Sequence, residues 1–152
     1  MSDSTENGII AKWPEGPVTV NDLAMKAVKL FSDEGQDCET AVISAFDDFL
    51  GLRLIDESEP KVRRIGLGFQ VPCGALLGAT RVLCHVLGPP HDSGRLAREL
   101  NLAFARKHKA STCQYLTAHI KWGEHHRFCG KYVYTAAELL WETLEPILAN
   151  RL

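Results

Sequence analysis

The apolar residues of this chain recur every three or four positions along most of its length, and this spacing constrains the fold more than any other feature. Such a pattern gives a helix one apolar face, which has to be buried against other helices. The alternation of apolar and polar residues that is typical of β-strands is nearly absent. The sequence therefore predicts an all-α fold, a single-domain bundle of five to six helices.

Local start and stop signals bound the expected helices. Thr19 and Asp22 have the spacing of a capping box, and Gly35 is typical of a helix end. Asp37 is a good N-cap, and Gly51 predicts the end of the helix that follows it. The expected helices span residues 19–34, 37–50, 73–87, 93–108, 113–121 and 129–152, with a weaker one over 58–65.

Length and charge exclude several classes of protein. With 152 residues, 45% of them apolar, the chain suits one compact domain, residues 19–152, which contains the cysteines and follows a flexible N-terminal segment, residues 1–18. The net charge of −2 argues against binding to nucleic acid. No secretory signal and no apolar run of about 20 residues is found, so we expect no membrane helix and a cytoplasmic location.

We expect Trp122 and Trp141 to lie in the core or at an interface. A homodimer is compatible with such an interface.

Four of the five cysteines follow a signal for the start of a helix. They are Cys38 after Asp37, Cys73 after Pro72, Cys113 after Thr112, and Cys129 at the start of the last helix. The first turn of a helix has unpaired N–H groups and the positive end of the helix dipole. Both favour a thiolate, which is the form of cysteine that attacks disulfides and binds metals. The pattern therefore indicates thiol or metal chemistry.

The fifth cysteine, Cys84, differs from the other four. It follows Cys73 by eleven residues on one expected helix, so the two lie about 16 Å apart along its axis. A disulfide needs Cα atoms closer than about 7 Å, so these two cannot pair within a straight helix. We interpret Cys84 as a core thiol, because free cysteine is among the most buried residue types. Gly74 and Gly78 on the same helix have a spacing that permits close backbone contact with a neighbour.

The segments around the four cysteines resemble the C_GCAxxG_C_C family of small redox-active proteins. These segments are residues 35–42, 73–79, 112–116 and 129–133, and the Cys-Gly-Ala-x-x-Gly block at 73–78 is the most specific. The resemblance covers about residues 19–145 and places the family's cysteines on Cys38, Cys73, Cys113 and Cys129. It implies an all-helical fold and redox activity without an established substrate. The glycine-rich run that precedes the family's second cysteine has only two glycines here, within residues 66–72.

Three hypotheses about function remain open. In the first, two of the four cysteines cycle between dithiol and disulfide with a redox partner protein, as in a thiol-dependent oxidoreductase. In the second, the four cysteines hold zinc or an iron–sulfur cluster, with His125 as a further ligand and Gly74 and Gly78 near the cofactor. His125, four residues before Cys129, can instead act as a base that ionises this cysteine. In the third, the chain is a helical interaction module without catalytic activity.

Overall fold

Helices make up most of the described part of the chain. A computed structural model describes residues 19–52, 73–87, 93–112, 116 and 129–151. Within these ranges the helices are α2 (Val20–Ser32), α3 (Cys38–Leu50), α4 (Gly74–Leu87), α5 (Ser93–His108) and α8 (Gly130–Arg151). No β-strand occurs among these residues, and the all-α prediction is confirmed. The predictions for residues 1–18, for 58–65 and for most of 113–121 fall outside the described residues.

The helix boundaries follow the local signals in the sequence. The Thr19 side chain accepts a hydrogen bond from the Asp22 N–H at 3.0 Å, so α2 begins where the capping residues predict. Asp37 caps α3 in the same way, because its Oδ1 accepts from the Thr40 N–H at 2.7 Å. Gly51 follows α3 with a left-handed φ of 65°, a conformation that glycine adopts without strain.

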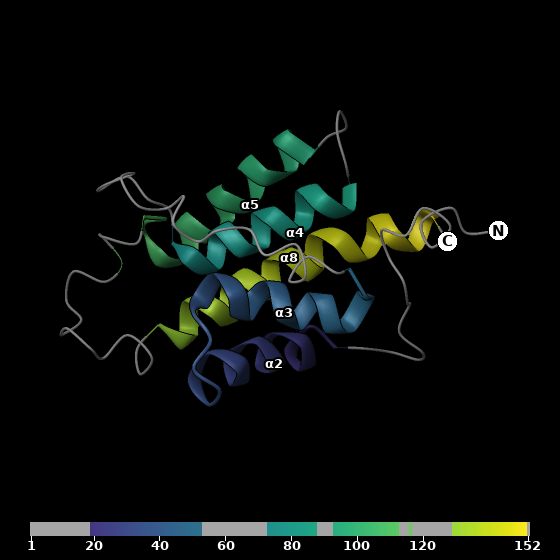
Figure 1. Ribbon diagram of the computed structural model, residues 1–152. Coiled ribbons are helices and arrows are strands. Elements are labelled where there is room, and N and C mark those ends of the chain that lie inside the picture. Colours follow the sequence, from purple (N-terminus) through teal and green to yellow (C-terminus); the bar gives the residue numbers. More distant parts are fainter. Residues whose placement is uncertain (1–18, 53–72, 88–92, 113–115, 117–128, 152) are drawn as a thin grey trace.

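The long helix α8 packs against each of the other helices, with α2 and α3 on one side and α4 and α5 on the other (Figure 1). The colours in Figure 1 show that α3, α4 and α8 run in one direction, while α2 and α5 run in the opposite direction. The amino-terminal ends of α3, α4 and α8 therefore lie at the same end of the bundle, on the left of the figure. We call it the cysteine end, because Cys38, Cys73 and Cys129 stand at these three helix starts.

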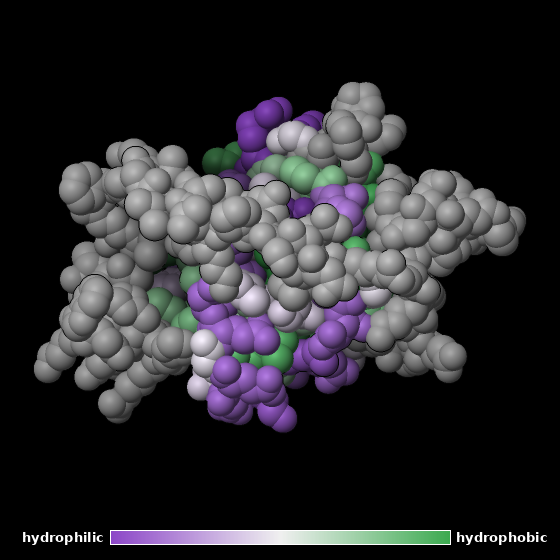
Figure 2. Space-filling view, viewed as in Figure 1, coloured by the Kyte–Doolittle hydropathy of each residue, from purple (hydrophilic) through white to green (hydrophobic). Residues whose placement is uncertain are grey.

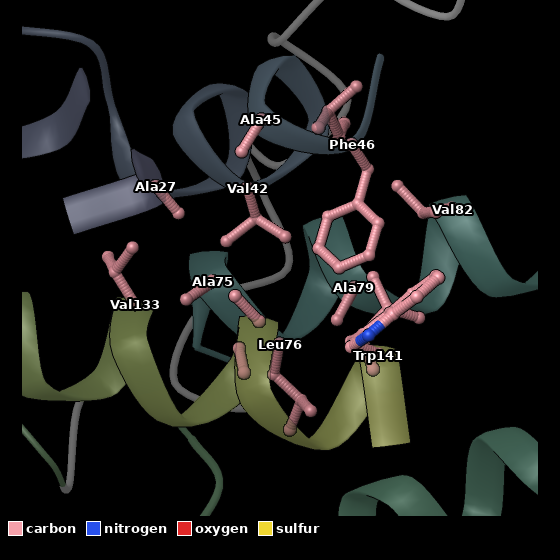
Figure 3. Packing of buried hydrophobic residues seen from close by; sticks show 14 of the residues in the cluster. Ala27, Val42, Ala45, Phe46, Ala75, Leu76, Ala79, Val82, Val133 and Trp141 are labelled. Carbon is pink, nitrogen blue, oxygen red and sulfur yellow. The ribbon is translucent and has the colours of Figure 1, made fainter. Parts of the chain in front are cut away.

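Aromatic side chains of α3 and α8 pack together within a core that is mostly aliphatic. The Trp141 ring of α8 meets the Phe49 ring edge-on, with 5.1 Å between the centroids, and lies 6.4 Å from the Phe46 ring. Figure 3 shows Phe46 and Trp141 together with Val82 of α4, so side chains from three helices meet there. Burial of each such side chain stabilises the fold by about 1.5–3 kcal/mol.

The first turn of α3 packs tightly against α4. A Cβ atom added to Gly78 would lie 2.6 Å from the carbonyl oxygen of Glu39, so only glycine permits this approach. The predicted close backbone contact is thus confirmed at Gly78. The buried Glu39 carboxylate also pairs with the guanidinium of Arg81 at 3.3 Å. These two contacts fix the segment that carries Cys38 against α4.

The outer faces of the helices are polar. Figure 2 shows hydrophilic side chains over the described surfaces of α2 and α5, with apolar residues in small areas between them. Met25 and Leu102 are the large apolar side chains that are exposed among the described residues. Within the same part of the chain, no helix is long and apolar enough to cross a membrane.

Candidate thiol site

Three of the four predicted cysteines stand at helix starts. Cys38 is the first residue of α3, whereas Cys73 and Cys129 directly precede α4 and α8. The carbonyl of Cys73 accepts a hydrogen bond from the Leu77 N–H at 2.9 Å, and that of Cys129 accepts from the Val133 N–H at 3.2 Å. Cys73 and Cys129 are therefore N-cap residues. Both are buried, and Cys38 is half-buried.

Tyr132 brings the surroundings of Cys73 and Cys129 together. This tyrosine lies in the first turn of α8, three residues after Cys129, and only 4% of it is exposed. Burial raises the pKa of the Tyr132 phenol, and negative charge on Cys129 and on Cys73 raises it further. α4 and α8 pack against each other, and both begin at the cysteine end. The buried Cys73 and Cys129 thus lie at the same end of two neighbouring helices.

Residues on both sides of Cys113 form hydrogen bonds with Cys73 and Tyr132. The carbonyl of Ser111 accepts a hydrogen bond from the Cys73 N–H at 2.7 Å. The carbonyl of Leu116 accepts one from the Tyr132 hydroxyl at 3.1 Å. Cys113 itself lies outside the described residues. The residues that flank it in the sequence are therefore in contact with Cys73 and with Tyr132.

The predicted metal ligands are only partly within the described residues. Cys38, Cys73 and Cys129 are described, while Cys113 and His125 are not. Among the described residues, no group of three cysteine, histidine or acidic side chains is arranged to hold a metal ion. The zinc or iron–sulfur site therefore stays a prediction.

Cys84 is exposed on α4, and its interpretation as a core thiol is wrong. The buried side of α4 includes Ala75, Ala79, Val82 and Val86. Cys84 lies on the opposite side of the helix, one turn after the partly exposed Thr80 and Arg81. The prediction relied on the general tendency of cysteine to be buried. The helical period, counted from the polar Thr80 and Arg81, places position 84 on the outer side of the helix.

His108 is a member of the site that sequence reasoning missed. Its ring meets the Tyr132 ring edge-on, with 4.8 Å between the centroids. Its Nε2 lies 2.9 Å from the hydroxyl oxygen of Thr135, which is buried. The sequence indicates only a basic last turn of α5, because the contacts of His108 with Tyr132 and Thr135 join residues more than 20 positions apart. Burial lowers the pKa of His108, and the charges of Lys131 and Lys107 lower it further.

This shift predicts a loss of stability in acid. The pKa of His108 is lower in the folded protein than in the unfolded chain, where it is about 6.5. The unfolded chain therefore takes up the proton first, and the free energy of unfolding falls as the pH drops below about 6.5. Urea unfolding between pH 7.5 and 5 measures this dependence. His108→Gln removes the titrating group and is expected to make the dependence less steep, and an unchanged slope would contradict the assignment.

Comparison with known families now identifies the cysteine pattern. The model of a family described as "Putative redox-active protein (C_GCAxxG_C_C)" matches residues 36–143. The chain belongs to this family. The match includes Cys38, Cys73, Cys113 and Cys129, and it confirms the resemblance on which redox activity was predicted. Comparison with curated proteins gives no match, and neither does comparison with solved structures.

Proposed function

We propose that this member of the C_GCAxxG_C_C family is a thiol redox protein in which Cys73 and Cys129 cycle between dithiol and disulfide. The observation that carries the proposal is their common position. Both are buried N-cap residues, and the two helices that they cap pack against each other and begin at the same end of the bundle. The family description supports redox activity in general.

The surroundings of the two cysteines suit thiol chemistry. An N-cap sulfur lies next to unpaired backbone N–H groups and the positive end of a helix dipole, and both stabilise a thiolate. The raised pKa of Tyr132 means that the phenol keeps its proton near neutral pH. It therefore adds no negative charge beside the thiolates. We assign Cys38 and Cys113 to the same site as the remaining thiols of the family pattern.

Redox titration with alkylation of the free thiols tests this proposal. The wild-type protein, equilibrated in glutathione buffers of graded potential, is expected to lose two thiols in one two-electron transition. Peptide mapping is expected to find Cys73 linked to Cys129. Cys73→Ser and Cys129→Ser should each abolish the transition.

Cys84→Ser is the matched control for these two variants. Cys84 is a free thiol on the same helix as Cys73, but it is exposed and lies about 16 Å further along the axis. This variant is expected to keep the wild-type transition. A transition that survives in the Cys73→Ser/Cys129→Ser double variant would show that another pair of thiols carries the redox change.

A further inference from the structure

Charge is divided unevenly over the cysteine end. The end of α5 and the start of α8 carry the exposed cations Arg106, Lys107, Lys109 and Lys131. The turn between α2 and α3, which precedes Cys38, instead carries the exposed Asp33 and Glu34. In the described part of the chain, the basic side of the cysteine end is the side formed by the end of α5 and the start of α8, next to Cys73 and Cys129.

Two of these lysines lie close in sequence to Cys129 and to the hydrogen-bond partner of Cys73. Lys131 follows Cys129 by two residues, and its Nζ lies 5.2 Å from the centroid of the Tyr132 ring. Lys109 comes two residues before Ser111, whose carbonyl accepts a hydrogen bond from the Cys73 N–H. One exposed lysine is therefore two residues from Cys129 in the sequence, and another is two residues from the hydrogen-bond partner of Cys73.

The position of Lys131 is unusual for a lysine. Basic residues at the end of α5 offset the negative end of that helix dipole, which explains Arg106 and Lys107 without any ligand. Lys131 instead lies in the first turn of α8, where the dipole is positive and a cation is unfavourable. Neither α8 nor α4 has an acidic residue in its first turn, in contrast to Asp22 of α2 and Glu39 of α3. Among the described residues, Lys107 pairs with Glu138 at 3.2 Å, but no acidic residue in the first turn of α4 or α8 offsets the charge of Lys131.

We propose that the thiol pair acts on disulfides that carry carboxylate groups, and that Lys131 and Lys109 attract them. This inference rests on the proposed function. One protein thiolate attacks a sulfur of the substrate, the substrate's S–S bond breaks, and the leaving thiolate takes a proton from water. The second protein thiolate then attacks the mixed disulfide and releases the other substrate thiol. Two electrons pass to the substrate, and the protein is left with a Cys73–Cys129 disulfide.

Three small aliphatic disulfides test the preference. They are dithiodiglycolate with two negative charges, bis(2-hydroxyethyl) disulfide without charge, and cystamine with two positive charges. The reduced protein is expected to react fastest with the anion and slowest with the cation, because attraction raises the rate of encounter. The rate ratio of anion to neutral disulfide is expected to approach one in 1 M salt, where the screening length is about 3 Å.

Removing the charge of each lysine tests whether the two lysines cause the preference for the anionic disulfide. Lys131→Gln and Lys109→Gln are each expected to reduce the ratio of anion to neutral rate roughly threefold at low salt. Lys26→Gln is the matched control, since Lys26 is exposed on α2 and pairs with Asp48. It should leave the ratio unchanged.

The outcomes separate the two proposals. A ratio that is the same in wild type and in both lysine variants overturns the substrate preference and leaves the redox function standing. If the neutral disulfide fails to oxidise Cys73 and Cys129 at all, the proposed function fails as well, and the preference fails with it.

Discussion

Replacement of Gly78 by alanine is expected to lower the free energy of unfolding by about 3 kcal/mol, near the upper end for an overpacked site. The new Cβ would lie 2.6 Å from the carbonyl oxygen of Glu39, and its next nearest atoms also belong to the Glu39 backbone. A backbone carbonyl cannot rotate away as a side chain can, so α3 has to move relative to α4. Urea unfolding measures the loss of stability.

Gly94→Ala is the matched control. Gly94 is exposed near the start of α5, and a Cβ added to it meets no atom within 4 Å. Alanine is the better helix former by roughly 0.5–1 kcal/mol, so this variant is expected to be neutral or more stable. Because Cys38 precedes Glu39, Gly78→Ala should also change the rate at which Cys38 is alkylated. Equal stabilities of the two glycine variants would contradict the close contact.

The features that could be predicted from the sequence are local. Thr19, Asp37 and Gly51 act on backbone groups no more than four residues away, so the type and spacing of residues are enough to place the helix ends. The same reasoning located Cys38 and Cys129 at helix starts. Gly78 was also predictable, because a small residue inside a helix indicates a close neighbour, although the neighbour itself could not be named.

The features that could not be predicted depend on contacts between distant segments. Tyr132 bonds to Leu116 sixteen residues earlier, and His108 bonds to Thr135 twenty-seven residues later. Neither side chain carries a local signal for its partner. Whether α4 and α8 begin at the same end of the bundle depends on the lengths and paths of the segments that precede them. Helical periodicity gives the apolar face of each helix, but it does not give the direction in which the helix runs.

The ion pair between Arg81 and Glu39 is the second contact that holds the first turn of α3, and its loss is expected to be similarly costly. Arg81→Met should lower the free energy of unfolding by about 3 kcal/mol, because a buried carboxylate loses its cation. The Glu39 side chain is only 6% exposed, and that of Arg81 is 24% exposed. The double variant Glu39→Gln/Arg81→Met is expected to recover part of the loss, since it removes both charges.

Arg95→Met is the control that shows whether burial or the N–O distance determines how much an ion pair stabilises the fold. Arg95 and Glu99 on α5 are closer, at 2.9 Å, but their side chains are 53% and 58% exposed. Water and salt screen such a pair, so its loss is expected to cost about 0.5 kcal/mol or less. If unfolding in urea gives equal losses for Arg81→Met and Arg95→Met, the buried pair does not fix α3 on α4. A larger loss for Arg81→Met, with faster alkylation of Cys38, would show that this pair holds the cysteine end together on its acidic side.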